Sequence, residues 1–180
     1  MPEIVLNLHA TRANVASRSF RYDEAIRDLE TAIEIAEAIG SAGNQATLLN
    51  NLGVVFSQCD RYQDSIQSFR EAERICLRLD EGPSLASIYA NLAVLHARKG
   101  EVDPMEKALR EGERLIPGSI GRRQEFFLKH ARGLCLLLGR GRYAEAAAEF
   151  QVAIRLGEAL GDRHLVSFDK VHRAEALIFE

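Results

Sequence analysis

The residues that could carry catalysis or bind a metal are few, and their spacing suits neither task. The histidines are His9, His96, His130, His164 and His172, and none belongs to an H-E-x-x-H segment or another metal-ligand spacing. The cysteines, Cys59, Cys76 and Cys135, form no C-x-x-C pair, so they predict neither a zinc site nor a disulfide framework. We therefore expect no metal, and free thiols that pack as small apolar groups.

Motifs for phosphate binding and nucleophilic catalysis are also missing from the sequence. It contains no glycine-rich phosphate loop and no nucleophile elbow. Carboxylates such as Glu34, Glu71 and Glu111 stand near arginines, in the pattern of a solvated helix face. The sequence thus predicts a protein that is not an enzyme, with no catalytic residues and no cofactor.

Composition excludes further classes of function. The chain has 180 residues, 47% of them hydrophobic, so it can bury a substantial core. Its formal charge of -3 argues against nucleic-acid binding, which requires a concentrated excess of positive charge. The longest apolar run, residues 134–138, is too short to span a membrane, and the N-terminus has no secretory signal pattern. We expect a cytoplasmic protein that binds neither nucleic acid nor membrane.

The elements that position these residues are expected to be helices throughout. Periodicity and turn signals predict helices near residues 3–19, 23–39, 43–59, 63–79, 84–99, 104–116, 121–138, 143–160 and 163–179. Gly40 and Gly161 follow two of them, where glycine most easily takes the left-handed conformation that ends a helix. Asp103 is expected to cap a helix beginning at Pro104, and Pro83 is expected between helices.

A repeat with a period near 40 residues organises these segments. The run Asn50-Asn51-Leu52-Gly53-Val54-Val55-Phe56 returns as Ala90-Asn91-Leu92-Ala93-Val94-Leu95-His96. The second helix of each unit opens at Tyr22, Tyr62, Val102 and Tyr143. Three parallel series follow, namely Ala25, Ser65, Met105 and Ala146; Leu29, Phe69, Leu109 and Phe150; and Ala32, Ala72, Gly112 and Ala153. Their offsets of three and four keep one face of the second helix towards the first, so we expect stacked helical hairpins.

These positions resemble the tetratricopeptide repeat, in its variety of about 40 to 42 residues found in kinesin light chains and bacterial signalling proteins. The resemblance implies an all-α fold, a right-handed α-solenoid of antiparallel helix hairpins in one domain over residues 1–180. About four repeats, at roughly 3–40, 43–80, 83–117 and 121–161, would precede an unpaired helix at 163–179. The pattern departs at Met105 and Gly112, where alanine is usual, and residues 140–142 hold one extra residue.

In tetratricopeptide folds the first helix of each hairpin lines the concave face, which implies a peptide-binding groove here. The groove residues it nominates are Asn14, Thr47, Asn50, Asn51, Val54, Ser87, Asn91, Val94, Arg98, Phe127 and His130. Asn51 and Asn91 resemble an asparagine ladder that hydrogen-bonds an extended peptide, because an amide both donates and accepts. Alternatively, these amides bridge neighbouring helices. Basic residues including Lys129 and Arg132 could favour an acidic peptide.

The sequence favours a non-catalytic scaffold that binds a protein partner's peptide or helix in this groove, which turns from polar to apolar along the chain. The apolar half could be a pocket for partner side chains, a homodimer seam or a thicker local core. The alternative function is a sensor or oligomerisation segment of a larger bacterial signalling protein. It would self-associate through the apolar C-terminal end, whose candidate residues are Leu165, Phe168, Val171 and Ile178.

Overall fold

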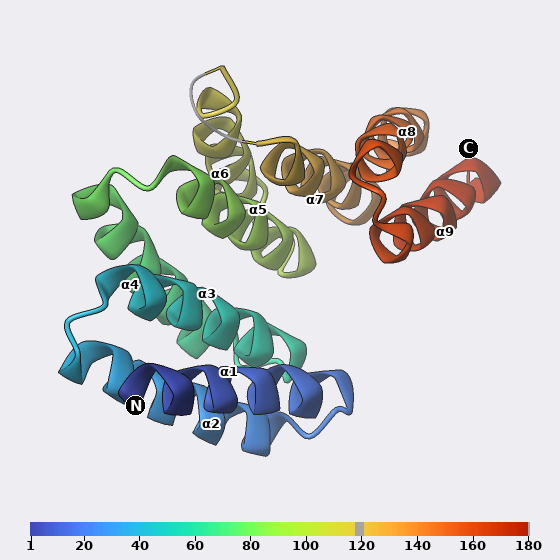
Figure 1. Ribbon diagram of the computed structural model, residues 1–180. Coiled ribbons are helices and arrows are strands. Elements are labelled where there is room, and N and C mark those ends of the chain that lie inside the picture. Colours follow the sequence, from blue (N-terminus) through green and yellow to red (C-terminus); the bar gives the residue numbers. More distant parts are fainter. Residues whose placement is uncertain (118–120, 180) are drawn as a thin grey trace. The chain divides into compact units, whose positions relative to one another are not determined.

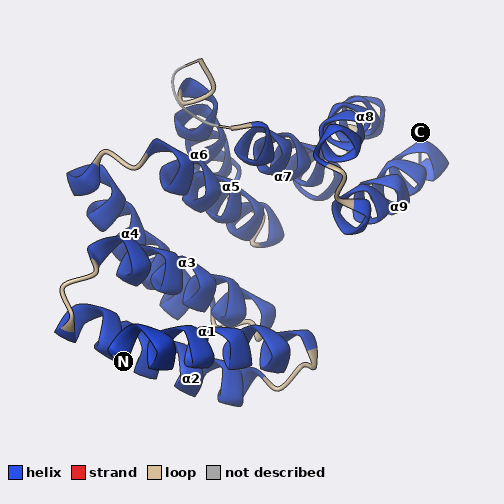
Figure 2. Cartoon of the chain, viewed as in Figure 1, coloured by secondary structure: helices blue, strands red, loops and turns tan. Residues whose placement is uncertain are grey.

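The computed structural model describes residues 1–117 and 121–179, without the side chains of residues 139, 140 and 164. These residues form helices joined by short turns, with no strand among them (Figures 1 and 2). The helices are α1 (Pro2–Arg18), α2 (Tyr22–Ala38), α3 (Ala42–Gln58), α4 (Tyr62–Leu79), α5 (Gly82–Arg98), α6 (Val102–Arg114), α7 (Arg122–Arg140), α8 (Tyr143–Leu160) and α9 (Arg163–Phe179). The predicted all-α solenoid fold is confirmed, and each predicted helix is present.

Two details of the predicted boundaries are wrong. Asp103 does not cap α6, because the helix begins at Val102 and the amide of Met105 already bonds to the Glu101 carbonyl at 3.1 Å. Pro83 lies in the first turn of α5 and not between helices. A proline is tolerated there because the first amides of a helix have no partner within the helix.

The turns repeat the same backbone device along the chain. A left-handed residue ends most helices, at Phe20, Gly40, Asp60, Asp80, Gly100, Gly141 and Gly161. The following amide bonds back to a carbonyl five residues earlier, as from Arg21 to Ala16 at 2.9 Å. The bond from Arg142 reaches back six residues, to Leu136, at 3.1 Å. This longer turn accommodates the extra residue predicted at 140–142.

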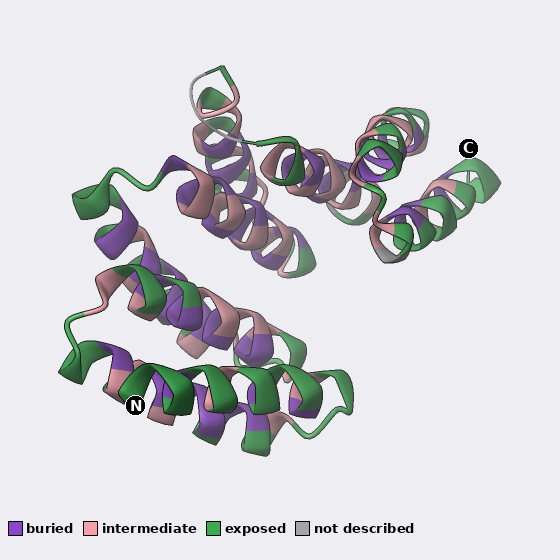
Figure 3. Ribbon diagram, in the orientation of Figure 1, coloured by how far each residue is buried: buried purple, intermediate pink, exposed green. Residues whose placement is uncertain are grey.

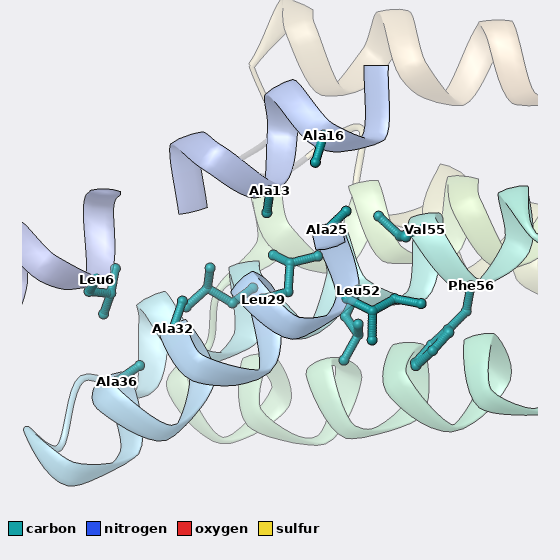
Figure 4. Close-up of a cluster of buried hydrophobic side chains, with 12 residues drawn as sticks. Leu6, Ala13, Ala16, Ala25, Leu29, Ala32, Ala36, Leu52, Val55 and Phe56 are labelled. Atoms are coloured by element: carbon teal, nitrogen blue, oxygen red, sulfur yellow. The ribbon is translucent and has the colours of Figure 1, made fainter. Parts of the chain in front are cut away.

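The chain divides into two compact units, Met1–Ser84 and Leu85–Glu180. In the first unit α1, α2 and α3 enclose an apolar core that includes Leu6, Leu29, Leu52 and Phe56 (Figure 4). In the second unit α8 packs against both α7 and α9, around residues such as Phe150. Buried residues follow the facing sides of the helices in each unit (Figure 3). The assignment of residues 1–180 to one domain stays a prediction.

Two hairpins depend on a glycine that faces a phenylalanine. A Cβ atom added to Gly53 of α3 would lie 2.6 Å from the ring of Phe69 in α4. A Cβ atom on Gly133 of α7 would lie equally close, 2.6 Å, to the ring of Phe150 in α8. The Gly53 carbonyl also accepts a hydrogen bond from the buried Ser65 hydroxyl at 2.7 Å. The two helices of these hairpins therefore approach too closely for any side chain at the glycine.

The other two hairpins carry a different pair at the same register. Their first helices have alanine, Ala13 or Ala93, where the second helices have leucine, Leu29 or Leu109, and all four are buried. Leucine replaces the larger phenylalanine on the second helix where alanine replaces glycine on the first. Gly112, which departs from the alanine usual at its position, is filled from the neighbouring hairpin, because Leu128 of α7 occupies the space of its missing Cβ. Packing against Leu128 therefore explains glycine at position 112.

This pairing predicts that Gly53→Ala destabilises the protein. Overpacking against Phe69 should cost about 1–3 kcal/mol. The higher helix propensity of alanine should offset ~1 kcal/mol of that cost. Combining Gly53→Ala with Phe69→Leu, which recreates the alanine–leucine pair, should recover part of the loss, with a coupling energy of about 1 kcal/mol. The measurement is urea unfolding followed by circular dichroism. Gly43→Ala is the matched control, because nothing lies within 4 Å of its Cβ position, and it should not destabilise. Strictly additive effects in the double variant would contradict the pairing.

Candidate functional site

The groove residues nominated in the first unit lie on α1 and α3. Asn14 and Thr47 are exposed, whereas Asn50, Asn51 and Val54 are half-buried. The Thr47 hydroxyl donates to the Gly43 carbonyl at 3.1 Å, so it is already used within its own helix. The ladder role of Asn51 stays a prediction.

A hollow of about 470 Å³ follows the exposed side of α1. Its lining residues are Thr11, Asn14, Val15, Ser17 and Arg18. The Ser17 hydroxyl donates to Gln58 Oε1 of α3 at 2.9 Å, so the two first helices of this unit are linked beside the hollow. Asn14 is the nominated groove residue that this hollow contains.

In the second unit, α5 carries Ser87, Asn91, Val94 and Arg98. Ser87, Asn91 and Val94 are half-buried and Arg98 is exposed. Asn91 therefore has the same intermediate exposure as Asn51 at the equivalent position of the preceding repeat. Its ladder role likewise stays a prediction.

Four of the remaining candidates meet in a pocket of about 260 Å³ between α7 and α9, which we call the α7–α9 pocket. It is lined by Phe126, Phe127, His130, Leu165, Phe168 and His172. The structure thus joins Phe127 and His130, nominated for the groove, with Leu165 and Phe168, nominated for self-association. Val171 and Ile178 lie outside the lining and are 56% and 77% exposed.

A buried carboxylate lies behind this pocket. Asp169 of α9 is fully buried, and its Oδ1 lies 2.5 Å from Nδ1 of His130. Because a carboxylate accepts hydrogen bonds, the Nδ1–H of His130 is the donor. Oδ2 of Asp169 has no hydrogen-bond partner among the described residues. The hydrogen bond from His130 therefore offsets part of the cost of burying this carboxyl group.

The two pocket histidines are also fixed by aromatic contacts. His130 stacks on Phe126 with ring centroids 6.1 Å apart, and His172 stacks on Phe150 at 5.6 Å. Nδ1 of His172 lies 3.0 Å from Oε2 of Glu175. Both imidazoles are thus held at one nitrogen by a carboxylate and at one face by a phenylalanine.

Sequence reasoning missed Asp169 and Phe126 as members of this arrangement. Asp169 lies 39 residues after His130, which is about one repeat, so the spacing was a usable signal. Asp169 occurs, however, in a helix that otherwise looked like an apolar terminal element. A buried acid in such a helix requires a partner, and that requirement was the missed indication.

The α7–α9 pocket is lined by hydrocarbon side chains and two imidazoles. None of the described residues that line it carries a hydroxyl or a thiol. Elsewhere, burial raises the pKa of the Cys76 thiol and raises that of Cys135 to about 12, so neither forms a reactive thiolate at neutral pH. Among the described residues, no three His, Cys, Asp or Glu side chains gather as metal ligands would.

Two basic residues of α7, Lys129 and Arg132, are engaged in ion pairs with neighbouring helices. Arg132 lies 2.5 Å from Glu113 of α6, and Lys129 lies 3.2 Å from Glu149 of α8. Burial alone would lower the pKa of Arg132, but Glu113 and Glu149 raise it above its ordinary value. Both cations therefore tie neighbouring helices together and are poorly placed to recruit an acidic peptide.

Antiparallel helix pairs with a fixed register and accessible surfaces on the first helices define a helical-repeat protein. The family model of the tetratricopeptide repeat matches residues 4–78 and 44–115, which together cover more than half of the chain. The chain belongs to the tetratricopeptide repeat family. A search of curated proteins with the whole sequence found no match. No helix in the described ranges is long and apolar enough to cross a bilayer.

Solved structures share the fold at low sequence identity. Aspartyl phosphate phosphatase F from Bacillus subtilis matches 95% of this chain with a TM-score of 0.68 and 18% identity. BtubC (BKLC) from P. vanneervenii matches 99% with a TM-score of 0.57 and 21% identity. This chain spans 48% of the first protein and 65% of the second, so it corresponds to part of each.

We predict that His130→Phe destabilises the protein by about 3 kcal/mol, because it leaves the buried Asp169 carboxylate without its partner. The matched control His172→Phe should cost under ~1 kcal/mol, since the pair with Glu175 is more exposed. Adding Asp169→Leu to His130→Phe should restore stability, because no buried charge then remains. Thermal unfolding measures all three variants. Equal losses in the two single variants would refute a special role for the buried pair.

Proposed function

We propose that this protein is a non-catalytic scaffold that binds a partner's peptide or helix on the first helices of its hairpins. In the first unit the binding residues would be Asn14, Thr47, Asn50, Asn51 and Val54. In the second unit they would be Ser87, Asn91, Val94, Arg98, Phe127 and His130. The observation that carries the proposal is the α7–α9 pocket, an accessible apolar cavity formed by two successive first helices.

Several further features support binding over catalysis. Membership of the tetratricopeptide repeat family favours protein–protein interaction, and the pocket lining lacks a nucleophile. The phosphatase in the name of the Bacillus subtilis structure describes that protein, and 18% identity carries only the fold across to this one. We place the scaffold in the bacterial cytoplasm, where free thiols such as Cys59 would remain reduced.

The test is selection of binding peptides from a random display library on the purified 180-residue chain. We expect enriched peptides whose affinity, measured by calorimetry, falls about tenfold in Asn51→Ala or Asn91→Ala, since each removes hydrogen bonds to the peptide backbone. Gln67→Ala is the matched control, because this exposed amide lies on a second helix and should leave the affinity unchanged. Failure to enrich any peptide, or equal binding by all three variants, would argue against the groove.

A second candidate function is self-association through α9. Its exposed apolar side chains, Phe168, Val171, Leu177, Ile178 and Phe179, are 47–77% accessible. Exposed apolar side chains gathered on one helix can mark an interface. The chain would then act as an oligomerisation or sensor segment of a larger signalling protein.

For this candidate we expect a dimer in light scattering that dissociates in the double variant Phe168→Gln, Val171→Gln, because the apolar contact is removed. Ala148→Gln on the exposed side of α8 is the control and should remain dimeric. A monomer at every concentration of the unmodified chain would eliminate self-association and leave the groove proposal standing.

A further inference from the structure

We propose that the α7–α9 pocket binds the side chain of a tyrosine from the partner protein. This inference rests on the proposed function, because it names the group that the bound peptide would insert. It follows from the size of the pocket, the hydrogen bonds of its two histidines and the carboxyl groups of Asp169 and Glu175 that contact them.

The pocket has the size for one side chain. Its volume of about 260 Å³ falls below the roughly 300–1,000 Å³ of sites for whole small molecules. Its apolar lining comes from Phe126, Phe127, Leu165 and Phe168. Aromatic rings attract one another in edge-to-face and offset arrangements, so an aromatic side chain gains more here than an aliphatic one of equal area. Phe168 remains 64% exposed and is available for such a contact.

The histidines add two polar positions to this apolar lining. His130 donates its Nδ1–H to Asp169 at 2.5 Å, and His172 has Nδ1 3.0 Å from Glu175. A carboxylate at one ring nitrogen fixes the tautomer, so the neutral imidazole keeps its hydrogen on Nδ1 and a lone pair on Nε2. Each pocket histidine then offers Nε2 as an acceptor, and as a donor when the ring carries a second proton.

A phenol matches this chemistry in both protonation states. The tyrosine hydroxyl donates to a neutral imidazole and accepts from a protonated one, whereas the tryptophan N–H can only donate. A phenylalanine ring would cover the histidines and leave their polar nitrogens without partners, which costs free energy. Tyrosine is therefore the aromatic side chain that satisfies the whole lining.

Charge selects a neutral ligand over an anionic one. Asp169 and Glu175 each contact one of the two imidazoles, and no lysine or arginine is among the described residues that line the pocket. The guanidinium of Arg123 lies 5.9 Å from the Phe127 ring, but it is paired with Asp162 at 3.6 Å. A phosphorylated tyrosine would bring negative charge towards two carboxylates, so we expect the unmodified hydroxyl to be bound.

The experiment is an NMR titration of the full ¹⁵N-labelled chain with N-acetyl-L-tyrosinamide, observed at the imidazole nitrogens. We expect saturable shifts at His130 and His172 with a dissociation constant of ~1 mM, which is the range for a ligand of this size. N-acetyl-L-phenylalaninamide and the phosphotyrosine analogue should bind at least about fivefold more weakly, because one lacks the hydroxyl and the other adds charge. No shift up to about 20 mM tyrosinamide, or tighter binding of N-acetyl-L-lysinamide, would overturn the proposal.

Paired variants on α9 and α7 sharpen the result. Phe168→Ala should weaken tyrosinamide binding about tenfold, whereas Val171→Ala, equally exposed but outside the lining, should leave it unchanged. His172→Phe should reduce the preference for the tyrosine amide over the phenylalanine amide, since it keeps a ring and removes one of the two pocket nitrogens. A tyrosine preference unchanged both in His172→Phe and in the double variant His130→Phe, Asp169→Leu would place the hydroxyl elsewhere and overturn the assignment.

The outcomes of this titration and of the peptide selection distinguish failure of the tyrosine pocket from failure of the scaffold proposal. Enriched peptides that lose affinity in Asn51→Ala but bind equally with and without tyrosine would uphold the scaffold and overturn the tyrosine pocket. Saturable tyrosinamide binding together with an empty library selection would uphold the pocket chemistry, and the fault would then lie with the groove proposal.

Discussion

The distance between the two helices of a hairpin is the constraint on which the other features depend. Where the second helix brings a phenylalanine ring, as at Phe69 and Phe150, the first helix has no side chain at the point of contact. Where it brings leucine, the first helix carries alanine. The glycine–phenylalanine and alanine–leucine pairs fill a similar total volume, although the two helices contribute different shares of it. Close packing of protein interiors requires such a match. The approach of the two helices also sets which face of the first helix points away from its partner.

Most of the fold was predictable because it is locally encoded. Helix positions follow from periodicity within single segments, and the turns at Gly40 and Gly161 follow from residues adjacent to them. The repeat then supplied the pairing of helices without any long-range calculation. The two wrong details, at Asp103 and Pro83, concern the first turn of a helix, where a capping residue and an interior one look alike in sequence.

The candidate site was less accessible to sequence reasoning, because it joins residues from different repeats. His130 was nominated from its place on a first helix, but its partner Asp169 lies in another helix and in an apolar stretch. Lys129 and Arg132, which the sequence offered as ligand-binding cations, are paired with carboxylates on neighbouring helices. Sequence spacing identifies a face of one helix, whereas the charge of a surface depends on which faces meet. The polarity of each half of the predicted groove therefore depends on which of its charged side chains are already paired within the protein.

The turns have a consequence for how such a chain can change over time. Most helix ends are closed by their own backbone, with a left-handed residue and one amide that bonds back to the preceding helix. Phe20, Asp60 and Asp80 adopt that conformation without glycine, so the turn geometry does not rely on a special residue at every junction. A copied or deleted hairpin would carry its own closures with it. Gene duplication could thus lengthen or shorten the array in whole hairpins, while single-residue insertions, such as the one near Gly141, are absorbed by one longer turn.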